Sequence, residues 1–400
     1  MLTQKNASTS LALFCKVVDN YGDIGICWRL ARQLQCEHGI AVTLWVDDLC
    51  SFQRICPDVV QALEMQQILG VTVRHWLAHE CDGDAGVVLS VVDVVDVADI
   101  VIEFFGCDIP SGYIDAMAQC EPRPVWLNLE GLSAEEWVEG CHKLPSPHPR
   151  LALTKYFFFP GFTEKTGGLL HEFDLDEQRR QFQAAPMAIA HFLARFGVTE
   201  AQAVSLKISL FCYPDAPASA LFDVWQLGAT TITCLVPEGV AQPAVQAFLG
   251  APATAGASAT RGALTVRVLP FVSQSDYDKL LWACDINFVR GEDSFVRAQW
   301  AGKPFIWHIY AQDEQLHHKK LRAFLQRQHS MASVDALSLR WNGADTGSDA
   351  AVQPSWRSLW QQFQSDMAEI ALESAQWQSR MLVNGDLATN LLAFSRSLPK

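Results

Sequence analysis

Short apolar runs alternate along this chain with longer stretches in which apolar residues recur every three to four positions. The first run is Leu11 to Val18, followed by a turn at 19–25 and a helical pattern at Ile26 to Leu34. Short apolar runs are typical of buried strands, and the three-to-four spacing is typical of helices. A strand, a glycine-bearing turn and a helix in this order predict the first unit of a doubly wound α/β domain.

The same alternation continues through both halves of the chain. The pattern predicts further strands at 41–46, 71–74, 98–104, 124–130, 203–211, 230–236, 264–269, 285–290 and 304–309. It predicts helices at 57–69, at 111–119, after a capping box that opens at Ser133, and at 174–196 with a bend at Pro186. Later helices are expected at 218–227, 243–249, 274–282, 294–301, 315–324, 356–372 and 388–398, and loops at 163–171, 251–262 and 342–355. Alternating strands and helices indicate parallel sheets.

Two domains are expected from the length and from this repeated alternation. We place the first at residues 1–178 and the second at 179–374, with a helix at about 375–400 that could pack back on the first. The chain has 400 residues, of which 50% are hydrophobic and 18% charged, enough for two large cores.

Composition also excludes several classes of protein. The formal net charge of −14 argues against a nucleic-acid partner, because such proteins usually present a basic face. None of the twelve cysteines forms a C-x-x-C pair, so we expect reduced, buried thiols and no zinc site or disulfide frame. The N-terminus has no basic leader region, and no unbroken apolar stretch reaches the ~18 residues of a membrane span. We therefore expect a soluble, cytoplasmic protein that does not bind a membrane.

The first turn carries two carboxylates, Asp19 and Asp23, with Asn20 and Gly22 between them. A turn that only holds a phosphate should not carry two negative charges. Either aspartate alone could simply cap a turn or a helix. The pair favours catalysis, because carboxylates at the mouth of a cleft act as general bases or hold a cation. Asp47 lies where a dinucleotide-binding unit has its ribose-binding acid, but the turn lacks the G-x-G-x-x-G spacing.

A second polar turn, 290–294, lies between a predicted strand and a predicted helix in the second half. Ser294 is expected to be the N-cap of that helix. The helix N-terminus together with Arg290 would suit a diphosphate. Alternatively, Glu292 and Asp293 merely complement the helix dipole.

Aromatic and amide side chains follow other strands of this half. Phe211, Tyr213 and Phe271 could stack on a nucleobase or belong to the core, and Gln274 could read a base edge or cap a helix.

Three other patterns are weaker. Asp82 and Asp84 form a D-x-D sequence in a polar turn, His75 and His79 are four residues apart without a third ligand, and 317–318 is a histidine pair expected on an exposed helix face.

Two long stretches, VVDNYGDIGICWRLARQL and INFVRGEDSFVRAQWAGKPFIWHIY, resemble the protein-arginine rhamnosyltransferases of bacterial elongation factor P. The resemblance spans the chain. It implies a GT-B fold, in which two Rossmann-like domains face each other across a cleft. It also implies an inverting, metal-independent transfer of L-rhamnose from dTDP-β-L-rhamnose to an arginine of elongation factor P. No cofactor is implied beyond this donor, and the partner is the acceptor protein.

The resemblance also implies roles for individual residues. Asp23 is the implied base, and Asp19 and Glu292 are implied to be needed with it. The implied substrate-binding residues are Arg290, Asp293 and Ser294 for the diphosphate, Phe211, Tyr213, Phe271 and Gln274 for the thymidine, and Asn20 beside the first carboxylates. One departure is Tyr21, where relatives have phenylalanine. Two other classes stay open: a glycosyltransferase with a small-molecule acceptor, and a noncatalytic nucleotide-binding module in which single carboxylate changes leave function intact.

Overall fold

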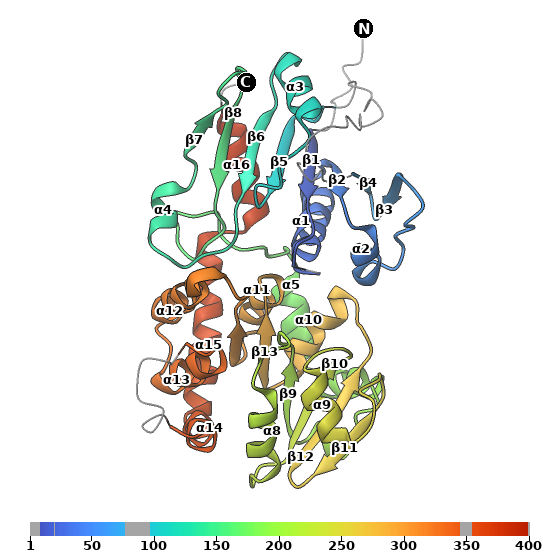
Figure 1. The fold of residues 1–400 in the computed structure, drawn as a ribbon, viewed down its shortest axis with the longest axis vertical. Coiled ribbons are helices and arrows are strands. Elements are labelled where there is room, and N and C mark those ends of the chain that lie inside the picture. The colour runs from blue at the N-terminus through green and yellow to red at the C-terminus, as the bar shows by residue number, and fades with distance from the viewer. Residues whose placement is uncertain (1–8, 20, 77–96, 345–353, 399–400) are drawn as a thin grey trace. The chain divides into compact units, whose positions relative to one another are not determined.

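The computed structural model describes residues 9–19, 21–76, 97–344 and 354–398. The chain forms two compact units, one of Met1–Glu172 with Val383–Lys400 and one of Phe173–Leu382 (Figure 1). The first unit ends at residue 172, six residues before the expected boundary at 178. The chain comes back to the first unit at residue 383, whereas we expected this near 375. Each unit has its own sheet and its own core, and we describe each by itself.

The first unit is built on a sheet whose described strands run in the order β3-β4-β2-β1-β5-β6-β8-β7. The inner strands are parallel, and β3 and β7 pair antiparallel at the two edges. Nearly continuous burial of the inner strands is what a parallel sheet covered on both faces requires. The strands are β1 Ser10–Cys15, β2 Ala41–Val46, β3 Met65–Ile68, β4 Val71–His75, β5 Ile100–Phe104, β6 Val125–Leu129, β7 Pro145–Pro147 and β8 Thr154–Phe158.

Helices cover both faces of this first sheet. Leu13, Leu30 and Leu391 belong to the core on one face, and Phe14, Tyr113 and Trp126 to the core on the other. The C-terminal helix thus packs on the first sheet and against its first helix. The helices of this unit are α1 Gly22–His38, α2 Leu49–Ile55, α3 Ser111–Gln119, α4 Trp137–Cys141 and α16 Leu387–Ser397, with the 3-10 helix η3 Leu382–Asn384 at the return to this unit.

Two local predictions in this unit are wrong. The segment 57–69, expected to be a helix, contains β3 instead. The helix α2 ends before Pro57, because a proline disfavours the helical conformation of the residue that precedes it. Between α2 and β3, the side-chain amide of Gln66 bonds the backbone of Val60. It accepts from the Val60 N–H at 2.8 Å and donates to the Val60 carbonyl at 3.0 Å. The capping box at Ser133 does not form either, because its hydroxyl bonds Glu135 and α4 begins only at Trp137.

Asp48 caps α2 and supports a stability prediction. Its Oδ1 accepts hydrogen bonds from the backbone N–H groups of Cys50 at 2.9 Å and Ser51 at 3.0 Å. Partial burial would raise the pKa of Asp48, but the hydrogen bonds from Ser51 and Cys50 outweigh it and hold the pKa below its usual value. We expect Asp48→Ala to lower the free energy of unfolding by about 1 kcal/mol. Urea titration measures this, and Asp48→Asn, which keeps a capping oxygen, should lose much less; equal losses would contradict the capping role.

The second unit is built on a sheet whose described strands run in the order β11-β12-β10-β9-β13-β14. All neighbours pair parallel except β11, which pairs antiparallel with β12 at the edge. Part of the expected loop 251–262 is therefore a strand, stabilised by its pairing with β12 and by a 2.9 Å contact between the hydroxyls of Thr260 and Thr265. The strands are β9 Leu206–Leu210, β10 Ile232–Pro237, β11 Ser258–Arg261, β12 Leu264–Leu269, β13 Ile286–Arg290 and β14 Phe305–His308.

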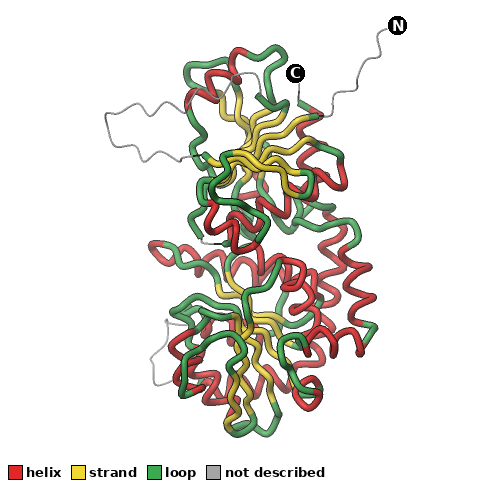
Figure 2. Tube along the Cα trace, turned by 90° about the vertical axis from the view of Figure 1, so that its right-hand side faces the viewer, coloured by secondary structure: helices red, strands yellow, loops and turns green. Residues whose placement is uncertain are grey.

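Helices lie on both sides of the strands of this unit (Figure 2). The long helix expected at 174–196 is two helices that break before Pro186, and the helix expected at 356–372 breaks at Asp366. The sequence pattern missed α7 and α13. The helices are α5 Leu175–Gln183, α6 Pro186–Ala194, α7 Glu200–Ala203, α8 Ala218–Gln226, α9 Gln242–Leu249, α10 Gln274–Ala283, α11 Asp293–Ala301, η2 Asp313–Gln315, α12 Leu316–Gln328, α13 Ala332–Trp341, α14 Trp356–Ser365 and α15 Met367–Met381.

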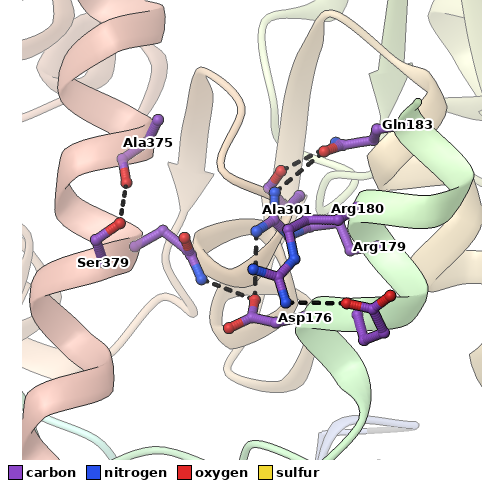
Figure 3. A network of polar contacts seen from close by, with 9 residues as sticks. Asp176, Arg179, Arg180, Gln183, Ala301, Ala375 and Ser379 are labelled. Carbon is purple, nitrogen blue, oxygen red and sulfur yellow. Dashed lines mark hydrogen bonds and ion pairs between the residues drawn. The ribbon is translucent and has the colours of Figure 1, made fainter.

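A polar network holds α5 inside the second unit (Figure 3). Arg179 donates to Asp176 at 3.3 Å and to Gln183 at 3.1 Å. Gln183 donates to the Ala301 carbonyl at the end of α11, and Asp176 accepts from Gln378 of α15 at 2.8 Å. These bonds join α5 to two helices of the second unit and explain why the chain changes units before α5, rather than inside it.

No helix among the described residues is long and apolar enough to cross a membrane. The eleven described cysteines are all free, and most are buried, as the sequence predicts.

Candidate active site

The turn after β1 folds around the carboxylate of Asp23. Asp23 lies in the first turn of α1 and is only 4% exposed. Its Oδ2 accepts hydrogen bonds from the backbone N–H groups of Val18 at 2.7 Å and Asp19 at 2.8 Å. The helix begins already at Gly22, so most of the expected turn 19–25 is helical and a negative charge at 23 is favoured by the helix dipole.

Burial raises the pKa of the Asp23 carboxyl above its ordinary value. The two backbone hydrogen bonds oppose this rise, and the charges of Asp19 and Asp47 add to it. A carboxylate with a raised pKa is a stronger proton acceptor at neutral pH, which is the property that a general base needs. Asp19 is partly exposed, in contrast to Asp23.

Gly22 brings α1 close to the Asp19 side chain. A Cβ added at Gly22 would lie 3.0 Å from Asp19 Oδ2, and the Gly22 N–H donates to the Asp19 carbonyl at 2.7 Å. A side chain at 22 would therefore displace the Asp19 carboxylate. Asn20, which we expected among the substrate-binding residues, lies outside the described residues.

In the second unit, Arg290 joins two of the predicted aromatic residues in one cluster. Arg290 ends β13, and its guanidinium carbon lies 4.4 Å from the ring centre of Phe211 and 4.8 Å from that of Tyr213. Its Nη1 also donates to the Cys212 carbonyl at 3.2 Å. The cluster lies at the carboxyl ends of the neighbouring strands β9 and β13, where ligands bind in sheets of this kind. Cation–π contacts hold the guanidinium in a fixed place.

Ser294 is not the N-cap of its helix, so that prediction is wrong. The helix α11 begins one residue earlier, at Asp293, and Glu292 occupies the N-cap position. The Ser294 hydroxyl instead accepts from the Arg290 N–H at 3.0 Å and donates to the Arg290 carbonyl. Gly291 makes the turn with a φ of +61°, and its carbonyl accepts from Trp307 Nε1 at 2.7 Å. The result is a fixed strand-to-helix turn with the α11 N-terminus beside Arg290.

The other two predicted base-binding residues lie near the end of β12. Phe271 is 46% exposed, and Gln274 is the buried first residue of α10. Gln274 does not cap α10, because the N-cap is Ser273. In strand order β12 lies two positions from β9, and α10 connects them: the Tyr277 ring centre is 5.7 Å from that of Phe211.

His308 belongs to the same cluster, although the sequence did not single it out. It ends β14 and is buried, and its Nδ1 accepts from the Tyr213 N–H at 3.2 Å. Burial lowers the pKa of His308 to about 4, against the opposing charge of Asp215. A neutral ring keeps Nδ1 as an acceptor, so His308 fixes the backbone of Tyr213. The only signal in the sequence was a single histidine at a predicted strand end.

This buried histidine predicts a pH dependence. Its pKa in the folded chain, about 4, lies below the unfolded value of roughly 6.5. The unfolded chain binds more protons between these two values, so stability falls as the pH falls from about 6.5 to about 4. We expect His308→Asn to lose less stability than the parent between pH 7 and pH 5 in urea titrations. The exposed His191, replaced in the same way, should change nothing; a parent-like loss in His308→Asn would refute the prediction.

Only part of the weaker sequence patterns lies within the described residues. His79, Asp82 and Asp84 lie outside the described residues, and the His75 ring bonds the Asp47 carbonyl at 3.0 Å. The pair 317–318 is half-buried rather than exposed, and each ring bonds the backbone of a neighbouring segment. In the part of the chain that the structure describes, no group of three His, Cys, Asp or Glu residues could hold a metal ion.

Two Rossmann-like units, each with a polar cluster at the carboxyl ends of its strands, make up the GT-B class of fold. The fold matches that of a solved ugt transferase from Siraitia grosvenorii in complex with UDP at a TM-score of 0.50 and 9% identity, over 97% of this chain and 99% of that one. The sequence matches the family described as Elongation-Factor P (EF-P) rhamnosyltransferase EarP over residues 11–396, and the chain belongs to this family.

Individual relatives agree with this assignment. A protein-arginine rhamnosyltransferase of Pseudomonas putida is 46% identical over 96% of this chain and 98% of its own length. One of Pseudomonas aeruginosa is 44% identical over 96% of this chain and 97% of its own. A structure solved for EarP-mediated arginine glycosylation of EF-P matches at a TM-score of 0.64 and 34% identity, covering 98% of this chain and all of that one.

These matches confirm the expected fold class and the expected activity, rhamnosyl transfer to an arginine of elongation factor P. A small-molecule acceptor and a noncatalytic nucleotide-binding module, the alternatives left open by the residues, do not fit this family.

Proposed function

We propose that this protein transfers L-rhamnose from dTDP-β-L-rhamnose to an arginine side chain of elongation factor P, with inversion at the anomeric carbon and without a metal ion. The cytoplasm is the proposed location, because translation takes place there. The family match supports the acceptor and the sugar. The observation that best supports the chemistry is the buried, hydrogen-bonded Asp23 with its raised pKa, next to Asp19.

The acceptor poses a chemical problem that carboxylates can solve. A guanidinium has a pKa above ~12, stays protonated, and has no lone pair available for attack. Asp23 is the proposed base, and Asp19 and Glu292 are proposed to act with it. Carboxylates close to the guanidinium neutralise its charge and disturb its delocalisation, and one of them takes the proton as the new bond forms.

The step balances as a single displacement. A bond forms between a guanidine nitrogen and C1 of rhamnose, and the bond between C1 and the phosphate oxygen breaks. The electron pair of that bond leaves with dTDP, and the proton of the attacking nitrogen passes to the Asp23 carboxylate. Attack from the face opposite the phosphate inverts C1.

The donor is proposed to bind the cluster at the start of α11. Arg290 and the first N–H groups of this nine-residue helix would meet the negative charge that develops on the leaving diphosphate. Asp293 and Ser294 are proposed to order this turn around the diphosphate. The thymine of the donor would lie among Phe211, Tyr213, Phe271 and Gln274. Asn20 stays a proposed substrate contact.

Product analysis tests the donor and the stereochemistry together. Elongation factor P is incubated with the enzyme and either dTDP-β-L-rhamnose or UDP-glucose, with and without EDTA. We expect deoxyhexose addition only from the rhamnose donor, unaffected by EDTA, and an α-linked sugar by NMR. Equal transfer from UDP-glucose would overturn the donor, a β-linked product would overturn the inversion, and loss of activity in EDTA would overturn metal independence.

A further inference from the structure

Asp47 adds its charge to the surroundings of Asp23, and it also contacts the segment that carries Asp19. Asp47 follows β2, and its neighbour Val46 pairs in parallel register with Cys15, the last residue of β1. The Asp47 Oδ1 accepts a hydrogen bond of 2.9 Å from the Val17 N–H. Asp47 therefore reaches across from the next strand to the chain as it leaves β1.

Three successive backbone N–H groups of this segment are held by two carboxylates. Asp47 binds the N–H of Val17, and Asp23 binds those of Val18 and Asp19. Residues 16–19 lie outside both β1 and α1, so these bonds replace the pairing that a strand or helix would give. The path of the backbone up to Asp19 thus depends on both side chains.

Asp47 is itself held firmly. The His75 ring bonds its carbonyl at 3.0 Å, and Trp76 donates from its backbone to Val46 at 3.1 Å and from its indole to Cys15 at 3.0 Å. These contacts tie the ends of β1, β2 and β4 together. A carboxylate mounted on such a fixed backbone can impose a position on its partner.

We propose that Asp47 is a positioning residue for the acceptor side of the reaction: its hydrogen bond to Val17 sets the path of the segment that presents the Asp19 carboxylate beside Asp23. The proposal rests on the proposed function, because it assumes that these two carboxylates meet the acceptor arginine. Asp47 acts through the backbone and does not touch the substrate.

Three substitutions distinguish an effect of the Asp47 hydrogen bond to Val17 from an effect of the negative charge of Asp47. Asp47→Asn keeps an oxygen for the Val17 N–H and removes the charge. Asp47→Glu keeps the charge and moves the oxygen by one methylene. Asp47→Ala removes both. Misplacement of a catalytic group by about 1 Å can cost on the order of 10²-fold in rate, so the positioning role predicts large losses of kcat for Ala and Glu and a nearly parental Asn variant.

The measurements are kcat and KM for elongation factor P at saturating donor, the affinity for dTDP, and amide exchange of the segment 16–19. For Asp47→Ala and Asp47→Glu we expect a fall in kcat of about 10- to 100-fold, unchanged dTDP affinity and faster exchange at Val17. Asp48→Ala is the matched control: it removes the neighbouring carboxylate and the cap of α2, and should leave kcat and the exchange of this segment unchanged.

Three outcomes would overturn the proposal. Parental kcat in Asp47→Ala shows that the hydrogen bond is dispensable. Equal losses in Asn and Ala with a parental Glu variant show that the charge acts instead. Unchanged Val17 exchange in Asp47→Ala shows that Asp47 does not hold the segment. If the proposed function itself fails, the parent protein will not rhamnosylate elongation factor P, which separates that failure from the failure of this proposal.

Discussion

Replacing Asp23 by asparagine is expected to lower the rate of rhamnosyl transfer by about 10²- to 10⁴-fold, the usual contribution of a general base. An asparagine oxygen can still accept the two backbone hydrogen bonds that Oδ2 makes at 2.7 and 2.8 Å, so the segment at Val18 and Asp19 should keep its shape. The variant loses the negative charge that faces the acceptor guanidinium and the ability to take a proton. The rate of rhamnosyl transfer is measured in single-turnover assays, and the affinity for dTDP is measured alongside.

The pH profile sharpens this test. A base works only when it is unprotonated, so the transfer rate should rise with pH through the pKa of Asp23, which burial places above that of an ordinary aspartate. Asp23→Asn should lack this rise. Asp23→Ala should in addition lose acceptor affinity, because Asp19 would no longer be held. Near-parental turnover by Asp23→Asn would show that another group takes the proton.

Replacing Arg290 by alanine is the second large effect that we expect. Its guanidinium lies over the rings of Phe211 and Tyr213, and Arg290 ends β13 just before the turn into α11. A hydrogen bond to a charged group contributes roughly 1.5–3 kcal/mol, which corresponds to a loss of about 10- to 150-fold in dTDP affinity. Calorimetry with dTDP measures it.

Two further variants make the Arg290 result specific. Arg290→Lys keeps a positive charge but loses the planar fork that binds a diphosphate with two bonds, so it should recover only part of the affinity. Arg195, ion-paired with Asp276 at 2.8 Å and half-exposed, is the control, and Arg195→Ala should bind dTDP like the parent. Unchanged affinity in Arg290→Ala would refute the diphosphate role.

The regular elements were predictable because their apolar patterns are strong. The bounds of β2, β12 and α3 match the sequence expectation residue for residue, and all three alternate or cluster apolar side chains clearly. The edge strands β3, β7 and β11 were not predicted. Their sequences, MQQI, PSP and SATR, contain few apolar residues, because these three strands are largely exposed and are held by backbone pairing that leaves no pattern in the sequence.

The candidate site was predictable only in part, for a similar reason. Asp19, Asp23 and Arg290 stood out as charges in turns beside predicted strands. The roles of Asp47 and His308 depend on hydrogen bonds to residues 30 and 95 positions away in the chain, which no local pattern reports. Ser294 was assigned a cap from its type alone, whereas its position one residue inside α11 makes it bind Arg290 instead.

The most direct test of this account is the mass of elongation factor P after incubation with the protein and dTDP-β-L-rhamnose, followed by fragmentation of the product. The account predicts a gain of one deoxyhexose that fragmentation places on a single arginine, and a gain about 10²- to 10⁴-fold slower when Asp23→Asn replaces the parent. An unmodified acceptor, or a deoxyhexose on any residue other than arginine, would contradict it.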